Sequence, residues 1–112
     1  MAQTVLIVDD HAGFRRFARR LLEAGGLTVV GEAGDGATAL VEAKRLDPDV
    51  VLLDVKLPDG DGFEIAAKVT QAVVLISSHE LDDLRTRLAR STARGFIPKA
   101  ELSAEAIARL VR

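Results

Sequence analysis

The sequence contains no cysteine, tryptophan or tyrosine, and only three prolines. Without cysteine the chain forms no disulfide bonds and offers no thiolate metal ligands, which fits a reducing cytoplasm. Because phenylalanine is the only aromatic residue, the core must consist mainly of valine, leucine, isoleucine and alanine. The N-terminus also lacks the basic segment and apolar stretch of a signal peptide, so we expect a cytoplasmic protein.

The chain likewise lacks a strong excess of charge and any apolar run near the ~20 residues that span a bilayer. Its formal net charge is −2, which gives no basic footprint for nucleic acid or for a membrane surface. Of its 112 residues, 48 % are hydrophobic and 29 % are charged, which predicts one globular domain over 1–112.

Short apolar runs alternate with helical patterns along the whole chain. Near-continuous runs of Val, Ile and Leu predict strands that are buried on both faces, as in parallel sheets. The expected strands lie near 4–8, 28–33, 50–54, 72–77 and 95–97. Strands that alternate with helices predict right-handed crossovers and a doubly wound parallel sheet.

Several local signals predict where the helices begin and end. Gly25-Gly26 is expected to end the first helix, and Asp47-Pro48 to follow the second. A short third helix is expected near 61–70, and Ser103 is a suitable N-cap for the last helix. The acidic segment 59–62 lacks the closing glutamate of a calcium loop, so we expect a turn and a helix cap there.

Polar residues stand at the carboxyl ends of four predicted strands. Asp9 and Asp10 follow the first run, Asp54 and Ser77 end the third and fourth, and Lys99 lies just past the last. In a parallel sheet these ends share one edge, where open α/β sheets bind their ligands. Three carboxylates favour a hard cation such as Mg²⁺, while a hydroxyl and an ammonium suit a phosphoryl group. A carboxylate can also act as a nucleophile and form an aspartyl-phosphate.

Four motifs resemble the receiver domain of two-component response regulators, the CheY-like family. They are Val5-Leu6-Ile7-Val8-Asp9-Asp10, the segment Leu53 to Gly62, Ile76-Ser77-Ser78, and Gly95-Phe96-Ile97-Pro98-Lys99. Their order and spacing cover essentially the whole chain. The resemblance implies a (βα)₅ flavodoxin-like fold with strand order 2-1-3-4-5. The third helix should be shortened, because the chain from Asp54 to Ser77 is shorter than usual in such domains.

The resemblance also implies the chemistry of the site. Asp54 would be the phosphoacceptor, and Lys99 would pair with it and then with the phosphoryl group. Ser77 would be the switch hydroxyl and Phe96 the switch aromatic residue. We therefore expect phosphorylation-controlled signalling, with no enzymatic activity beyond self-phosphorylation from a phosphodonor and slow autodephosphorylation.

Mg²⁺ would be the cofactor in a domain of this kind. Its ligands would include Asp54, with Asp10 bound directly, Asp9 bound mainly through water, and the backbone carbonyl of Lys56 completing the set. Three further side chains flank the expected phosphoryl group and could tune its lifetime, or else are simply exposed: Lys56, Ser78 and His79.

The expected partners follow from the same resemblance. A sensor histidine kinase or phosphotransferase would supply the phosphoryl group, and a downstream effector or output domain would bind the fourth helix, fifth strand and fifth helix. No membrane contact is expected, nor nucleic acid binding by this domain alone, and both a monomer and a homodimer are left open. Arg15, Arg16, Arg19 and Arg20 form either a solvated face of the first helix or a docking surface for the phosphodonor.

Three alternatives remain beside a stand-alone receiver, which Met1 just ahead of the first strand slightly favours. The chain could be the receiver part of a longer DNA-binding regulator, as Ile97-Pro98-Lys99 and the short last helix suggest. It could be a degenerate receiver that only binds proteins, although its acidic set is complete. It could also be a phosphohydrolase with an aspartyl nucleophile, although Asp9-Asp10-His11 lacks the Asp-x-Asp pattern that is common in those enzymes.

Overall fold

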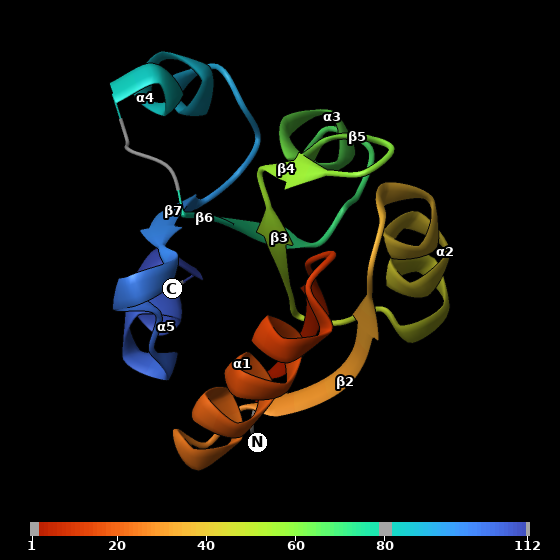
Figure 1. Ribbon diagram of the computed structural model, residues 1–112, viewed down its shortest axis with the longest axis vertical. Helices are drawn as coiled ribbons and strands as arrows, with labels where there is room; N and C mark the ends of the chain where they lie inside the picture. The colour runs from red at the N-terminus through yellow and green to blue at the C-terminus, as the bar shows by residue number, and fades with distance from the viewer. Residues whose placement is uncertain (1–2, 79–81, 112) are drawn as a thin grey trace.

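The computed structural model describes residues 3–78 and 82–111. Its main sheet has five parallel strands in the order β2-β1-β3-β6-β7 (Figure 1). The strands are β1 (Thr4–Val8), β2 (Thr28–Ala33), β3 (Val50–Asp54), β6 (Ala72–Ser77) and β7 (Gly95–Pro98). Numbered as the five predicted strands, this is the order 2-1-3-4-5, so the predicted fold class is confirmed.

A helix follows each strand of the sheet. The helices are α1 (Ala12–Ala24), α2 (Gly36–Leu46), α3 (Gly62–Ala66), α4 (Asp82–Ala89) and α5 (Ala104–Val111). Among the described helices, none is long and apolar enough to cross a membrane. Two further features were not predicted: a small antiparallel hairpin of β4 (Lys56–Leu57) and β5 (Gly60–Asp61), and the 3₁₀ helix η1 (Lys99–Glu101). Elements of two or three residues are too short to show a periodic pattern in the sequence.

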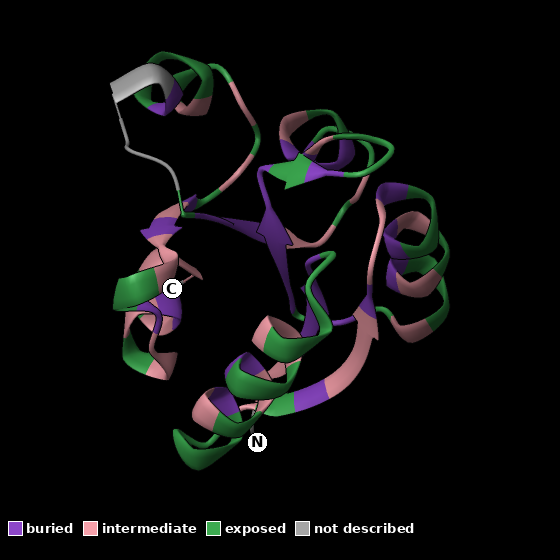
Figure 2. Cartoon of the chain, viewed as in Figure 1, coloured by how far each residue is buried: buried purple, intermediate pink, exposed green. Residues whose placement is uncertain are grey.

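The sheet separates two hydrophobic clusters, because successive side chains of a strand point to opposite faces. On one face Leu6 and Leu53 pack in a cluster with residues of α2, α3 and α4, among them Ile65 and Leu84. On the other face lie Ile7, Leu52, Leu22 of α1 and Ile107 of α5. Figure 2 shows the central strand β3 buried along its length, and all five of its residues are buried. Burial on both faces explains why the strands have near-continuous apolar sequences.

The predicted ends of α1 and α2 and the predicted N-cap of α5 are confirmed. Gly26 follows α1 with a φ of +95°, and Asp47 follows α2 with a φ of +45°. At the start of α5, Oγ of Ser103 accepts a hydrogen bond from the amide of Ala106 at 3.0 Å. The third helix is a short stub, as expected, although it ends at Ala66 and not near residue 70. The carboxylate of Asp61 caps it by accepting from the amide of Phe63 at 2.7 Å.

Candidate functional site

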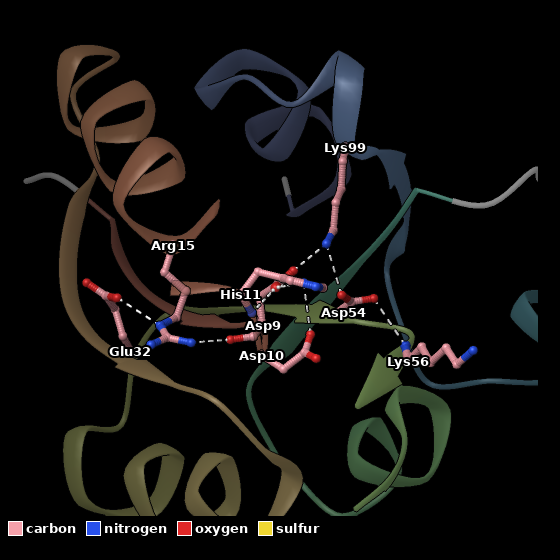
Figure 3. Close-up of polar contacts among 8 residues, drawn as sticks. All are labelled: Asp9, Asp10, His11, Arg15, Glu32, Asp54, Lys56 and Lys99. Carbon is pink, nitrogen blue, oxygen red and sulfur yellow. Dashed lines mark hydrogen bonds and ion pairs between the residues drawn. The ribbon is translucent and has the colours of Figure 1, made fainter. Parts of the chain in front are cut away.

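The strand order brings two of the predicted carboxylates and the predicted lysine together at the carboxyl edge of the sheet. Asp9 follows β1 and is fully buried, and Asp54 ends the neighbouring strand β3 with 5 % of its surface exposed. Lys99 begins η1, directly after β7. Its Nζ lies 2.5 Å from Oδ2 of Asp9 and 3.0 Å from Oδ2 of Asp54 (Figure 3). One ammonium group therefore bridges two buried carboxylates.

The electrostatics of these three groups are interdependent. Burial raises the pKa of Asp54, and the adjacent Asp9 carboxyl adds to this rise against the lowering effects of the Lys56 amide and Lys99. For Asp9, burial also disfavours the anion, but Lys99 and the amide of His11 lower its pKa below the ordinary value. Burial disfavours the cation of Lys99 as well, but the two carboxylates raise its pKa. Of the pair, Asp54 is therefore the carboxyl group that is harder to ionise.

Asp10 lies beside this pair on the turn between β1 and α1. Its Oδ1 is 3.1 Å from Nδ1 of His11, and the same nitrogen is 3.2 Å from Oδ1 of Asp9. The side chain of His11 is 71 % exposed, in agreement with the expectation of an exposed residue at the helix entry. One donor atom from each of Asp9, Asp10 and His11 lies within 4.8 Å of the others, a grouping that could hold a metal ion.

The fit to a hard divalent cation can be judged from charge and donor chemistry. When ionised, the carboxylates of Asp9 and Asp54 share the ammonium of Lys99, and Asp10 adds a third negative charge beside them, so negative charge is in excess among these groups. Oδ2 of Asp9 is buried and accepts no hydrogen bond within the described part of the chain. Its contact with Lys99 is an ion pair. Carboxylate oxygens are the ligands that Mg²⁺ prefers, and its charge would offset the excess. The residues present therefore fit this ion.

A cavity of about 310 Å³ opens over the site. It is lined by Asp10, His11, Asp54, Lys56, Leu57, Pro58, Ser78 and Lys99. Lys56 and Ser78 are exposed there, and their role in tuning the lifetime of a phosphoryl group stays a prediction. The amide of Lys56 donates to Oδ1 of Asp54 at 3.1 Å. His79 lies outside the described residues.

The two predicted switch residues lie on the neighbouring strands β6 and β7. Ser77 is buried at the end of β6, where it pairs in register with Pro98 of β7. Phe96 is half-buried on β7 opposite Leu75 of β6, and it also lines a cavity beside α5. The two residues are thus connected through the β6–β7 pairing, and Ser77 lies in register with the residue that precedes Lys99.

The backbone of Asp54 is tightly packed against Gly62. A Cβ atom at Gly62 would lie 2.4 Å from the carbonyl oxygen of Asp54, so only glycine fits there. The amide of Gly62 donates to the carbonyl of Val55 at 2.7 Å. In the same loop, Asp59 accepts from the amides of Gly36 and Ala37 at 2.7 and 3.0 Å, and so it caps α2. The expected turn and helix cap are present, but the caps belong to two different helices.

The arginines of α1 divide into two pairs. Arg15 and Arg19 both donate to Glu32 of β2, with Nε–O distances of 3.0 and 2.9 Å, whereas Arg16 and Arg20 are exposed. The first pair is therefore not simply a solvated face, and docking of a phosphodonor on this helix stays a prediction. A signal was present in the sequence: Arg15 and Arg19 have the i,i+4 spacing of one helix face, and Glu32 is the one charged residue of β2.

The fold and the site together define a doubly wound α/β domain with an acidic, lysine-bridged site at the carboxyl edge of its sheet. The sequence model of the response regulator receiver domain family matches residues 5–111. The chain therefore belongs to this family, whose members are the receivers of two-component phosphorelay signalling.

Named relatives and solved structures agree with this assignment. The chain is 39 % identical over 109 residues to the response regulator GacA of Pseudomonas viridiflava, which covers 92 % of the chain and 51 % of that protein. It is 38 % identical over 109 residues to the probable transcriptional regulatory protein NarL of Mycobacterium tuberculosis, covering 92 % of the chain and 50 % of that protein. The chain thus spans about half the length of these curated relatives.

Among solved structures, the receiver domain of the M. tuberculosis NarL regulator superimposes with a TM-score of 0.87 at 35 % identity, covering 98 % of the chain and 96 % of that domain. A LuxR-family response regulator from Aurantimonas superimposes with a TM-score of 0.89 at 26 % identity, covering 99 % of the chain and 86 % of the other. These similarities support the receiver fold along essentially the whole chain.

Proposed function

We propose that residues 1–112 form one receiver domain that is phosphorylated on Asp54 with Mg²⁺ as its cofactor. The observation that carries this proposal is the bridge from Lys99 to Asp9 and Asp54 across three strand ends. A cation that contacts the presumed nucleophile and a second buried carboxylate suits a site in which negative charge arrives with a phosphoryl group. Membership of the receiver family supports the same role.

The proposed reaction is an in-line transfer to a carboxylate oxygen of Asp54. The oxygen–phosphorus bond forms as the bond from phosphorus to the donor breaks, and the donor leaves with the electron pair of that bond. Asp9, Asp10, Asp54 and the carbonyl of Lys56 would hold Mg²⁺, which supplies positive charge opposite the phosphoryl oxygens. The amide of Lys56 fixes Oδ1 of Asp54, and Lys99 stays within reach of both the carboxylate and the transferred group.

The proposed switch uses the β6–β7 pairing. The hydroxyl of Ser77 would move to the phosphoryl group, and Phe96 on the adjacent strand would then repack. This would shift an existing equilibrium between two arrangements of the surface formed by α4, β7 and α5. Lys56, Ser78 and His79 are the proposed tuning positions for the lifetime of the phosphoryl group.

The proposed phosphodonor is a sensor histidine kinase or a phosphotransferase, and the proposed recipient of the signal is an effector or output domain at α4, β7 and α5. The name of the NarL relative, a transcriptional regulatory protein about twice as long as the aligned segment, supports control of a DNA-binding output.

The test is the intact mass of the protein after incubation with acetyl phosphate and Mg²⁺. We expect a single phosphoryl adduct that hydroxylamine removes, and that is absent with EDTA and in Asp54→Asn. An unmodified mass in protein shown to be folded, or an adduct that persists in Asp54→Asn, contradicts the proposal. Steady turnover of phosphomonoesters would instead favour a phosphohydrolase with an aspartyl nucleophile.

A further inference from the structure

The peptide group that joins Asp9 to Asp10 is held by a side chain of α1. Nη1 of Arg15 donates to the carbonyl oxygen of Asp9 at 2.5 Å, while its Nε donates to Oε1 of Glu32 at 3.0 Å (Figure 3). The side chains of Arg15 and Glu32 are only 20 % and 27 % exposed. The planar guanidinium group therefore spans from β2 to the end of β1, with a separate nitrogen for each acceptor.

Glu32 is itself fixed from a second direction. Its Oε2 accepts from Nε of Arg19 at 2.9 Å, and Nη1 of Arg19 donates to the carbonyl of Val29 in the same strand at 3.2 Å. The two guanidinium groups lower the pKa of Glu32 against the opposing effect of burial, so Glu32 remains a charged acceptor at neutral pH. Arg15 is thus anchored to a rigid partner.

The backbone amide of Asp9 is also held by β2. The amide of Asp9 donates to the carbonyl of Ala33, the last residue of β2, at 3.0 Å. With the Arg15 contact to its carbonyl, both backbone polar groups of Asp9 are held with reference to β2. The plane of the Asp9–Asp10 peptide influences the directions in which the two carboxylates leave the main chain, so these contacts help to orient the buried Asp9 and the cavity-lining Asp10.

We propose that Arg15 and Glu32 are positioning residues for the metal ion: they hold the Asp9–Asp10 peptide in the orientation in which both carboxylates reach the cation. This inference rests on the proposed Mg²⁺-dependent function. Neither residue contacts the ion. Outer groups that orient metal ligands typically change metal affinity by roughly 10–100-fold when they are altered.

The informative substitution is Arg15→Lys, which keeps the charge and the aliphatic stem but loses the forked geometry. One ammonium cannot reproduce the two planar contacts to Asp9 and Glu32, so we expect Mg²⁺ to bind about tenfold more weakly. Glu32→Gln should weaken binding in the same direction. If the two residues act as one unit, the double variant should bind Mg²⁺ about as weakly as the weaker single variant.

The experiment measures the Kd for Mg²⁺ by isothermal titration calorimetry, together with the urea unfolding midpoint without Mg²⁺. Arg16→Ala is the matched control, since Arg16 is an exposed arginine on the same helix, and its Kd should equal that of the wild type. A positioning role also predicts that labelling by acetyl phosphate is slow in Arg15→Lys at low Mg²⁺ and recovers at saturating Mg²⁺. A purely structural role would not give this recovery.

The inference is overturned if folded Arg15→Lys binds Mg²⁺ as tightly as the wild type, or if its labelling stays slow at saturating Mg²⁺. Mg²⁺ binding and labelling of the wild type show whether the inference alone is wrong or the proposed function is wrong as well. A wild-type protein that binds no Mg²⁺ and takes no phosphoryl group refutes the proposed function and, with it, the inference. Normal wild-type binding with unchanged variants refutes the inference alone.

Discussion

Replacing Lys99 by methionine should destabilise the Mg²⁺-free protein strongly. The substitution keeps most of the stem but removes the ammonium that lies between Asp9 and Asp54 and 4.5 Å from the ring centroid of Phe14. Removing one partner of a buried ion pair typically costs about 3–5 kcal/mol, because a buried charge is left unpaired. Here the lysine side chain is 16 % exposed, and Asp54 can take up a proton because its pKa is already raised.

Because of this partial exposure and this proton uptake, the expected loss in the free energy of unfolding lies near the lower end of that range, at about 3 kcal/mol. For a domain of this size, each kcal/mol lowers Tm by about 4 °C, so Tm should fall by roughly 12 °C. Urea unfolding followed by far-ultraviolet circular dichroism measures the loss directly. Lys44→Met, an exposed lysine on α2, is the matched control and should change stability little.

Mg²⁺ provides the decisive comparison. If the ammonium and the metal ion offset the same excess of carboxylate charge, Mg²⁺ should stabilise Lys99→Met by more than it stabilises the wild type. A Lys99→Met protein that is as stable as the wild type without Mg²⁺ would refute the reasoning. So would a variant whose stability does not depend on Mg²⁺ although the wild type binds the ion.

Three further predictions concern the loops around the site. Without Mg²⁺, Asp54→Asn should be more stable than the wild type at pH 7. The pKa of Asp54 is higher in the folded protein than the unfolded value of 3.8, so ionisation of Asp54 opposes folding. This cost appears as the pH rises through 3.8 and is complete above the folded-state pKa. Urea unfolding at pH 7 and pH 3.5 tests this, and an equal gain at both would contradict it. Gly62→Ala should cost about 3 kcal/mol, because its Cβ would overlap the Asp54 carbonyl; wild-type stability would show that this loop relaxes freely. Asp59→Ala should lower Tm by removing the cap on the amide of Gly36, and an unchanged Tm would show that water replaces it.

The sequence predicts the sheet well because strands that are buried on both faces have near-continuous apolar sequences. The three inner strands β1, β3 and β6 are almost entirely Val, Ile and Leu, and the carboxyl ends of parallel strands must share an edge. The sequence alone was therefore enough to place Asp9, Asp54 and Lys99 at one edge of the sheet. Their predicted roles as ligand, phosphoacceptor and partner of the phosphoryl group remain proposals.

The contacts that orient the site could not be predicted in the same way. Arg15 and Glu32 are 17 residues apart, and Asp59 and Gly36 are 23 apart. The i,i+4 spacing of Arg15 and Arg19 places them on one helix face, but no helical or strand period names the partner of a side chain that is distant in sequence, so the contacts themselves depend on tertiary packing. The β4–β5 hairpin escaped prediction for a related reason, since each of its strands has only two residues.

The close approach of Gly62 has a mechanical consequence for how this domain could transmit a signal. The main chain at Asp54 lies in the central strand β3, between β1 and β6, with Gly62 against its carbonyl, so it has almost no room to recoil. The β2 edge is clamped to α1 through Glu32, whereas β7 is the opposite edge strand and pairs with β6 alone. Because the centre of the sheet and its β2 edge are both held in this way, a displacement that begins at Asp54 would meet fewer of these ties toward β7 than toward β2.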